Sequence, residues 1–494
     1  MYFRRVIENG ASPCRVDWNG TGYLRPNHKS EIANRKSVSQ GVSLSEETLN
    51  RQVATALLGI DALWGGDVMN PSGVGRAVVD SWFSDAPMPE AYTHPAAAKL
   101  RQTGGVSAKE PDRGAIDAYL AAVDVKGAIG GVSEKGRELS GLRGTFFEGL
   151  SDCLSAMWDL SMAILGRGPA VPYERCVFAA TGRRPEPSRP VEKRRRLSEL
   201  LARAGHPAKT NEELLAAVDA WRRERMVPAK SIATLANAFI ARFDAQTTKN
   251  LAPHLSEDLR GVPRSNMTFV PIKDAWFSGF MNYVGRARNP DGSPQYEATY
   301  EINASLQISV PEFEQLIGHE VVPGHVTTSA LIQGLYVRGR VGFESTILAM
   351  NTRWGTLAEG IGNNAVLIAL GLTEVEQVPD EDLQIGLWLA HLQDDAKNEA
   401  SYRIWQDAVP PADVATTLRR EFLVSEERAG KFAGAWGLHP LFGRMNLPAY
   451  RAGTEVVAEL RRRYPPKKVL PALYGGSGLV DVVTLRRAIV GATT

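Results

Sequence analysis

Apolar residues recur at three- and four-residue steps over much of the first half of the chain, a pattern typical of amphipathic helices. After Ser45, which can cap a helix, Leu49, Val53 and Leu57 begin such a run. Similar patterns cover, in chain order, residues 117–123, 143–165, 191–204, 211–225 and 230–243. Residues 1–44 are polar and have no sustained period, so we expect a polar N-terminal arm there.

The pattern changes near the middle of the chain. Residues 166–190 are dense in glycine and proline, which predicts a boundary or a long connection. Two stretches rich in β-favouring residues, 267–272 and 296–309, predict a small antiparallel sheet around the turn-forming residues 289–292. From Val310 the apolar spacing is helical again, with Pro311 well placed in a first turn. We therefore predict a mainly α protein, a multi-helical body with a small sheet, divided into 1–44, a helical region 45–265 and a metal-site region 266–494.

The composition is that of an ordinary globular protein, with 44% hydrophobic and 23% charged residues. The 57 Lys and Arg residues nearly balance the 55 Asp and Glu residues, so the net charge of +2 offers no attraction to nucleic acid or to an anionic membrane. Cys14, Cys153 and Cys176 form no Cys-x-x-Cys pair, which argues against a disulfide framework and a thiolate zinc site. No secretory leader and no membrane-spanning run is apparent, so we expect a soluble, cytoplasmic protein.

The strongest chemical signal is the segment His319-Glu320-Val321-Val322-Pro323-Gly324-His325. Zinc hydrolases with the motif H-E-x-x-H place two imidazoles one helical turn apart, beside a glutamate that acts as general base. Six residues on a straight helix leave two side chains roughly 120° apart, too far for one metal. Pro323 and Gly324 predict a local kink that returns His325 to the side of His319. We expect both histidines to be metal ligands and Glu320 to be the base.

A catalytic zinc usually has a third protein ligand. Glu359, in a further helical stretch, is the candidate that we predict for this role. Four residues later stands Asn363, whose amide oxygen could accept a hydrogen bond from a ligand imidazole. The alternative is that two core histidines on a kinked helix are hydrogen-bonded and Glu359 is a surface carboxylate.

These residues resemble a bacterial family of presumed zinc hydrolases, the domain of unknown function 885 family, whose site is similar to that of gluzincin peptidases. The resemblance rests on H-E-x-x-P-G-H at 319–325, on Glu359-Gly360, and on a late A-Y-x-x-G at 449–453, and it covers about residues 265–494. It implies a mostly helical body, a zinc ion in a deep cleft and hydrolysis of peptide-like amides. The chain departs from the family pattern at Val326, Asn364 and Val366, which favours a specialised substrate over general peptidase activity.

Further candidates lie downstream. Tyr450 could donate a hydrogen bond to a developing oxyanion, or it could be a packed aromatic residue. Arg444 and Arg451 could bind a substrate carboxylate, or they could be exposed arginines. His391 and Asp395, on a helix predicted over 387–404, could hydrogen-bond the metal ligands, or they could belong to a solvated charged face.

The sequence therefore predicts a zinc-dependent hydrolase acting on a peptide or a small molecule. Two imidazoles and one carboxylate would also suit Mn²⁺ or Fe²⁺. Two alternatives stay open: a metal-dependent enzyme for a non-peptide small molecule or biosynthetic intermediate, and a non-catalytic binding protein on a retired hydrolase fold.

Overall fold

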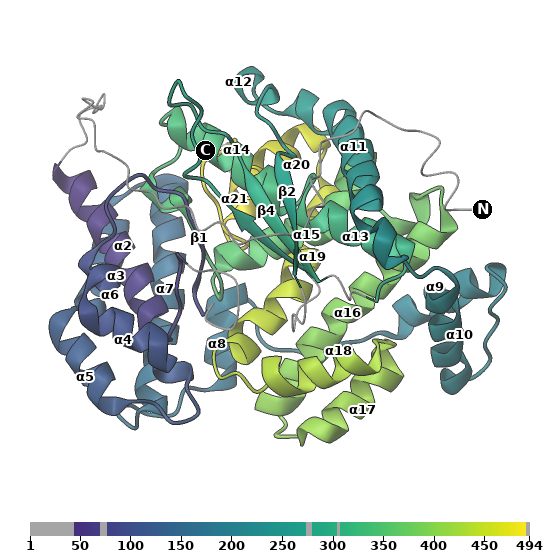
Figure 1. The fold of residues 1–494 in the computed structure, drawn as a ribbon, viewed down its shortest axis with the longest axis horizontal. Coiled ribbons are helices and arrows are strands. Elements are labelled where there is room, and N and C mark those ends of the chain that lie inside the picture. Colours follow the sequence, from purple (N-terminus) through teal and green to yellow (C-terminus); the bar gives the residue numbers. More distant parts are fainter. Residues whose placement is uncertain (1–43, 70–76, 273–278, 304–306, 491–494) are drawn as a thin grey trace.

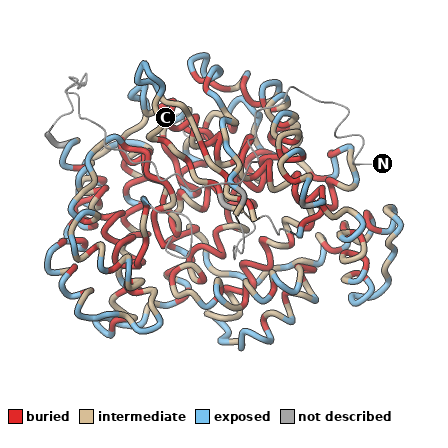
Figure 2. Tube along the Cα trace, in the orientation of Figure 1, coloured by how far each residue is buried: buried red, intermediate tan, exposed pale blue. Residues whose placement is uncertain are grey.

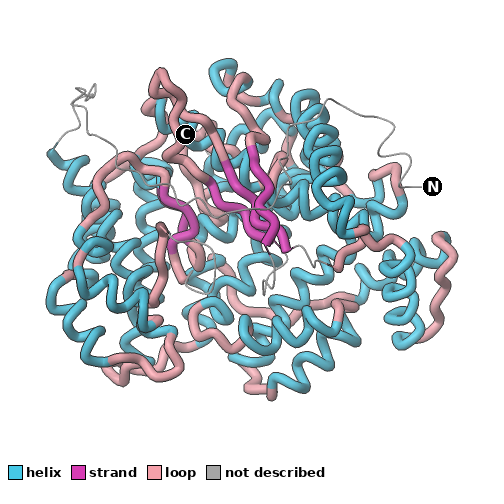
Figure 3. Tube along the Cα trace, viewed as in Figure 1, coloured by secondary structure: helices cyan, strands magenta, loops and turns pink. Residues whose placement is uncertain are grey.

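The computed structural model describes residues 44–69, 77–272, 279–303 and 307–490 (Figure 1). The arm predicted over residues 1–44 lies outside this range except for Leu44, as does Cys14. Helices make up most of the described chain, as Figure 3 shows, so the prediction of a mainly α protein is confirmed. Within the described residues, no helix is both long and apolar enough to span a membrane.

Seven helices of the N-terminal part pack together at one end of the molecule, on the left of Figure 1. They are α2 (Leu44–Leu63), α3 (Glu90–Thr93), α4 (Pro95–Thr103), α5 (Arg113–Ala122), α6 (Val125–Glu138), α7 (Gly141–Ile164) and α8 (Tyr173–Thr181). Helix α8 lies inside the segment that the glycine and proline density marked as irregular. The nine residues between Pro172 and Gly182 contain neither breaker, and Gly182 ends the helix with a φ of +67°, which glycine adopts without strain.

Four helices connect this part to the sheet: α9 (Val191–Arg203), α10 (Asn211–Glu224), α11 (Ile232–Asn250) and α12 (Glu257–Arg260). Helices α9 and α10 form the pair at the right of Figure 1. The start of α10 has a capping box, in which the Thr210 hydroxyl accepts from the Glu213 N–H and the Glu213 carboxylate accepts from the Thr210 N–H. The helices predicted over 191–204, 211–225 and 230–243 correspond to α9, α10 and α11.

The predicted sheet is present, but it is mixed rather than antiparallel. Its strands are β2 (Met267–Ile272), β3 (Gly279–Tyr283) and β4 (Ala298–Asn303) in the order β2-β4-β3. Strand β4 pairs in parallel with β2, from Met267 opposite Ala298, and antiparallel with β3. The prediction was wrong on this point because β3, which was not predicted, lies between β2 and β4 in sequence, and β4 pairs with both strands.

A second, two-stranded sheet joins distant parts of the chain. Strand β1 (Val79–Trp82) pairs antiparallel with β5 (Ile347–Ala349), with Trp82 opposite Ile347. This pairing brings a segment of the N-terminal part next to the helices that carry the candidate metal ligands.

Three helices carry those ligands, α13 (Val310–Glu320), α14 (His325–Val337) and α15 (Arg353–Leu370), and α16 (Glu381–Trp405) packs against α13. Each of three helix starts has a side-chain cap, with Ser309 accepting from the Glu312 N–H, Thr352 from the Gly355 N–H and Asp380 from the Leu383 N–H. The chain ends in α17 (Pro411–Phe422), α18 (Glu426–Lys431), α19 (Leu447–Arg463), α20 (Pro466–Leu473) and α21 (Leu485–Val490).

Buried residues run through the whole molecule (Figure 2). The largest cluster contains residues from both predicted regions, for example Leu57 of α2 and Ile361 of α15. Helix α16 contributes to all three buried clusters, through Leu387, Leu389 and Ala400. It therefore connects the α9–α10 pair and the α17–α18 pair to the largest cluster. Cys153 and Cys176 are buried free thiols.

Candidate metal centre

The His-Glu segment spans two helices instead of one kinked helix. Helix α13 ends at Glu320 and α14 begins at His325, with a four-residue turn between them. Within the turn the Gly324 N–H donates to the Gly318 carbonyl at 3.1 Å. A Cβ on Gly324 would lie 1.6 Å from the His319 carbonyl oxygen, so only glycine fits there. The turn brings His325 back against His319, as predicted, by ending the helix.

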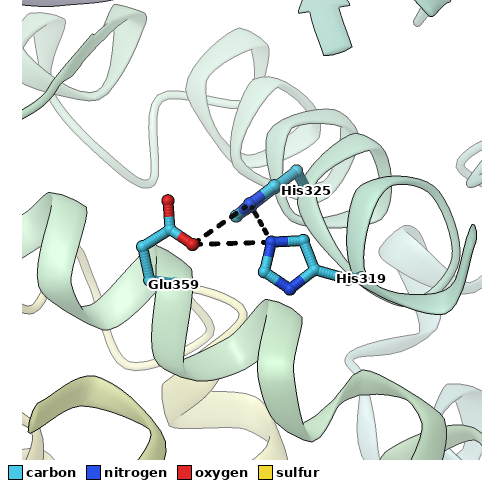
Figure 4. A group of neighbouring side chains, drawn as sticks. All are labelled: His319, His325 and Glu359. Carbon is cyan, nitrogen blue, oxygen red and sulfur yellow. Dashed lines mark hydrogen bonds and ion pairs between the residues drawn. The ribbon is translucent and has the colours of Figure 1, made fainter. Parts of the chain in front are cut away.

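His319, His325 and Glu359 come together from α13, α14 and α15 (Figure 4). The two Nε2 atoms are 3.1 Å apart, and Glu359 Oε2 lies 3.4 Å from the Nε2 of His319 and 4.0 Å from that of His325. The exposed fraction of the side chain is 10% for His319, 13% for His325 and 19% for Glu359, so solvent reaches the group.

These three residues fit a single metal ion. Ligand atoms around a tetrahedral zinc lie roughly 3.3 Å apart, given metal–ligand distances of about 2.0–2.2 Å. The observed separations are close to this value. Glu359 Oε2 is a buried oxygen that accepts no well-formed hydrogen bond from the described residues, which leaves its lone pairs for a cation. Two imidazole nitrogens and a carboxylate oxygen are donors suited to Zn²⁺.

His319, His325 and Glu359 shift one another's pKa values. Burial would raise the pKa of Glu359, but the contact with His319 and the charge of His325 lower it to about 2. Burial lowers the pKa of His325 to about 4, with a contribution from the charge of His319. The pKa of His319 is raised, because Glu359 and Glu320 outweigh its burial. Without metal, a proton in this group is therefore held mainly on His319.

Glu320 is the last residue of α13 and directly follows the candidate ligand His319. Burial raises its pKa to about 7; the charge of His319 opposes this shift, whereas those of Glu359 and Asp80 add to it. A carboxylate whose pKa lies near neutrality can both accept and release a proton during a reaction. The charge of Asp80 on β1, which the sequence did not single out, also acts on His325 and Tyr450.

Asn363 does not accept a hydrogen bond from an imidazole in the structure, contrary to the prediction. Its amide nitrogen donates to Asp394 Oδ2 at 2.7 Å and to Thr454 Oγ1 at 2.9 Å. The Thr454 hydroxyl lies 3.2 Å from the same oxygen of Asp394. The Asn363 amide is therefore turned toward α16 and α19.

The carboxylate that faces the site from α16 is Asp394, and its neighbour Asp395 faces elsewhere. Asp395 pairs with Lys193 at 2.8 Å and approaches Arg451 at 3.7 Å. Adjacent residues on a helix point about 100° apart. The sequence could not show which of the two aspartates faces the site, because it does not give the rotation of α16 about its axis. His391 packs edge-on against Trp388, and no described contact joins it to the three candidate ligands.

Tyr450, at the start of α19, lies close to the candidate ligands. Burial raises the pKa of its phenol well above the usual value, and the charges of Glu359 and Glu320 add to this rise. The Nζ atom of Lys397 lies 3.2 Å from the centre of its ring. Lys397 is buried on α16, and its Nζ is 3.5 Å from Asp394 Oδ1. Lys397 was not among the residues predicted from the sequence, although its i, i+3 spacing from Asp394 is a recognisable signal.

The two candidate arginines have protein partners. Arg444 stacks on Trp405, with its guanidinium carbon 3.9 Å from the ring centre. Arg451 pairs with Glu455 at 2.9 Å and donates to the Pro187 carbonyl at 3.1 Å. The structure therefore brings neither arginine into the group formed by the histidines and Glu359.

Glycines allow the close packing around the ligands. A Cβ on Gly362 would lie 2.8 Å from the His319 ring, so α15 approaches that imidazole through a glycine. A Cβ on Gly360 would lie 2.4 Å from the Gly453 carbonyl oxygen, which shows that α15 and α19 cross with their main chains in contact. The resemblance had included Gly360 and Gly453 without a structural reason, and this crossing supplies one.

Comparisons with known proteins give little beyond this geometry. No family model matches the chain, and no curated protein matches it. The structure of a candidate lipoprotein from Colwellia psychrerythraea is similar, with a TM-score of 0.49 and 13% identity, over 74% of this chain and 66% of that one. A candidate lipoprotein of unknown function from Shewanella oneidensis has a TM-score of 0.44 and 12% identity, over 82% and 79%. At these values neither likeness bears on function.

Proposed function

We propose that the protein is a zinc-dependent hydrolase that cleaves a peptide-like amide bond. The observation that carries the proposal is the convergence of His319, His325 and Glu359 donor atoms within 4.8 Å of one another. The resemblance of the motifs to the domain of unknown function 885 family supports it. The same donors would accept Mn²⁺ or Fe²⁺.

In the proposed reaction, the three ligands would hold the metal, which when bound makes a water molecule more acidic and polarises a carbonyl. Glu320 accepts a proton from the water as the water oxygen attacks the carbonyl carbon. It then delivers this proton to the amide nitrogen as the carbon–nitrogen bond breaks. Tyr450 donates a hydrogen bond from its phenol to the carbonyl oxygen as negative charge develops there.

A non-peptide amide is the second candidate substrate. Its support comes from Asn364 and Val326, two positions where the chain departs from the family pattern. Asn364 donates to the Gly360 carbonyl at 2.9 Å and to the Thr454 carbonyl at 3.2 Å, and Val326 is fully buried. Both side chains serve packing, so polar groups that the family places there are missing from the site. A narrower substrate range follows from that loss.

Metal analysis of the purified full-length protein tests the proposal. We expect about one equivalent of zinc per chain, and none in a His319→Ala His325→Ala variant. His206→Ala is a matched control. The imidazole of His206 lies 3.1 Å from the Glu224 carboxylate, and neither residue belongs to the group of candidate ligands. A metal-free wild-type protein, or equal metal in the double variant, would contradict the metal centre and favour a binding protein.

A substrate panel then separates the enzymatic alternatives. Dipeptides, N-acyl amino acids and other small amides are incubated with the zinc-loaded protein, with and without a chelator. Cleavage of generic dipeptides would favour a peptidase, whereas cleavage confined to non-peptide amides would favour the second candidate. No chelator-sensitive cleavage of any of them would contradict the hydrolase.

A further inference from the structure

Tyr450 is held by groups other than its hydroxyl. Its main-chain carbonyl accepts a hydrogen bond from the Thr454 hydroxyl at 2.8 Å, and the face of its ring lies under the Lys397 ammonium. The phenol hydroxyl makes no hydrogen bond to any residue that the structure describes. The ring is therefore placed by Lys397 and by α19, and its hydroxyl is left to donate to a ligand.

Lys397 is itself fixed by a buried network that reaches three helices. Asp394, one turn earlier on α16, lies 3.5 Å from the Lys397 ammonium. Asp394 also accepts from Asn363, one turn after Glu359 on α15, and lies 3.2 Å from Thr454, one turn after Tyr450 on α19. The network thus connects the helix of a candidate metal ligand with the helix of the phenol.

Neutralising Asp394 does not account for the position of this lysine. The Asp394 Oδ2 atom already accepts a hydrogen bond from Asn363, and the Lys397 ammonium lies closer to the Tyr450 ring centre, at 3.2 Å, than to Asp394 Oδ1, at 3.5 Å. A cation within about 6 Å of an aromatic ring centre is attracted to the ring face, and more strongly when both are buried. A positive charge there also favours release of the phenol proton, so the hydroxyl becomes a stronger hydrogen-bond donor.

We propose that Lys397 is a positioning residue for Tyr450: its buried ammonium holds the ring and strengthens the hydroxyl as a donor toward a metal-bound ligand. The inference rests on the proposed function, in which Tyr450 donates to a carbonyl oxygen. It adds a residue that acts through Tyr450 and touches no substrate.

A double-mutant cycle on the zinc-loaded, full-length protein tests this role, with acetohydroxamate as the probe. Calorimetry gives its Kd for the wild type, Lys397→Met, Tyr450→Phe and the double variant. Each single variant should bind about three- to tenfold more weakly. The double variant should bind no more weakly than Tyr450→Phe alone, because Lys397 acts only through that hydroxyl. Additive losses would mean that Lys397 acts on the ligand directly, and wild-type affinity in Lys397→Met would mean that it does not act; either result overturns the proposal.

Three further variants test whether a general folding defect explains the loss of acetohydroxamate affinity. Lys397→Met leaves Asp394 without its cation, so Asp394→Asn Lys397→Met removes both charges and should show the same loss as Lys397→Met. Lys397→Arg keeps the charge and should recover part of the affinity. Lys193→Met breaks the ion pair between Lys193 and Asp395, the residue that follows Asp394 on α16. This variant should bind acetohydroxamate like the wild type. A loss in Lys193→Met equal to that in Lys397→Met would overturn a specific role.

A readout without metal separates this inference from the proposed function. With 3-fluorotyrosine at position 450, the metal-free wild type should give one sharp ¹⁹F resonance, and Lys397→Met should shift or broaden it. An unchanged spectrum would overturn the positioning role. Absence of zinc binding by the wild type would overturn the metal centre and leave this spectral comparison intact.

Discussion

Gly362 lies directly against the imidazole of His319: a Cβ on this glycine would be 2.8 Å from both Nδ1 and Cε1 of the ring. The imidazole therefore occupies the space that any other residue at position 362 would need for its side chain. The Nε2 atom of this ring points toward His325 and Glu359 (Figure 4).

A Gly362→Ala variant should consequently lose zinc affinity while keeping its fold. The added methyl group forces the His319 ring to move, and shifts of this kind around metal ligands typically cost about 10- to 100-fold in affinity. Zinc titration against a chelating indicator measures this loss. The matched control is Gly130→Ala, where a Cβ meets nothing within 4 Å on the exposed side of α6. Equal zinc affinity in the two variants would contradict the role of Gly362.

Replacing the turn between α13 and α14 should remove His325 from the metal group. In Pro323→Ala Gly324→Ala, a Cβ at position 324 would collide with the His319 carbonyl oxygen, so the turn cannot keep its path. Both substitutions also favour a continuous helix, since proline costs about 3 kcal/mol and glycine about 1 kcal/mol relative to alanine. We expect a folded protein, by circular dichroism, with zinc affinity at least about tenfold weaker. Unchanged affinity in the folded variant would show that the turn does not position His325.

Glu320→Gln should separate proton transfer from metal binding. The amide keeps the size of the side chain but cannot accept the proton of the water, and a general base contributes about 10²- to 10⁴-fold to the rate. We expect zinc content equal to that of the wild type and a loss of this size in kcat, measured on whichever amide the panel identifies. Normal turnover would remove the general-base role, whereas loss of zinc would make Glu320 a structural partner of the ligands.

Zinc affinity should fall with decreasing pH in a way that reports on His319. An imidazole binds metal only when it is neutral, and the pKa of His319 is raised in the metal-free protein, so its proton competes with zinc. His325, with a pKa of about 4, is neutral above about pH 5 and does not compete. Below the pKa of His319 we therefore expect affinity to drop about tenfold per pH unit, one proton for each zinc.

Glu359→Gln gives the comparison for this pH dependence. The variant removes the carboxylate that raises the pKa of His319, so its affinity, although weaker, should begin to fall at a lower pH than in the wild type. Chelator competition between about pH 5 and pH 8 measures both curves. An identical midpoint in the two proteins, or a slope of two protons in the wild type, would contradict this assignment.

Local patterns in the sequence predicted much of the fold. Strand β2 has the predicted bounds, and α13 begins at Val310, because β-favouring runs and helix caps are decided by neighbouring residues. The His319, His325 and Glu359 group was predicted from spacing and from the resemblance. The kink predicted within a single helix was wrong in detail, because the chain ends α13 at Glu320 and starts α14 at His325.

The surroundings of the candidate ligands could not be predicted in the same way. Asp394 rather than Asp395 faces the site because of the rotation of α16 about its axis, which tertiary packing sets. The charge of Asp80 acts on Glu320 because β1 pairs with β5, across a long stretch of chain. Gly362 carries no chemistry of its own, and its importance is visible only once the His319 ring lies against it.

The crossing of α15 and α19 at Gly360 and Gly453 has a consequence for heat resistance. Main-chain atoms in contact have no rotamers, so warming cannot loosen this spacing through alternative side-chain conformations. Glu359 precedes Gly360 and Tyr450 lies one turn before Gly453, so the distance between their main chains depends on this crossing. The local geometry should persist unchanged during heating and disappear only when the whole molecule melts.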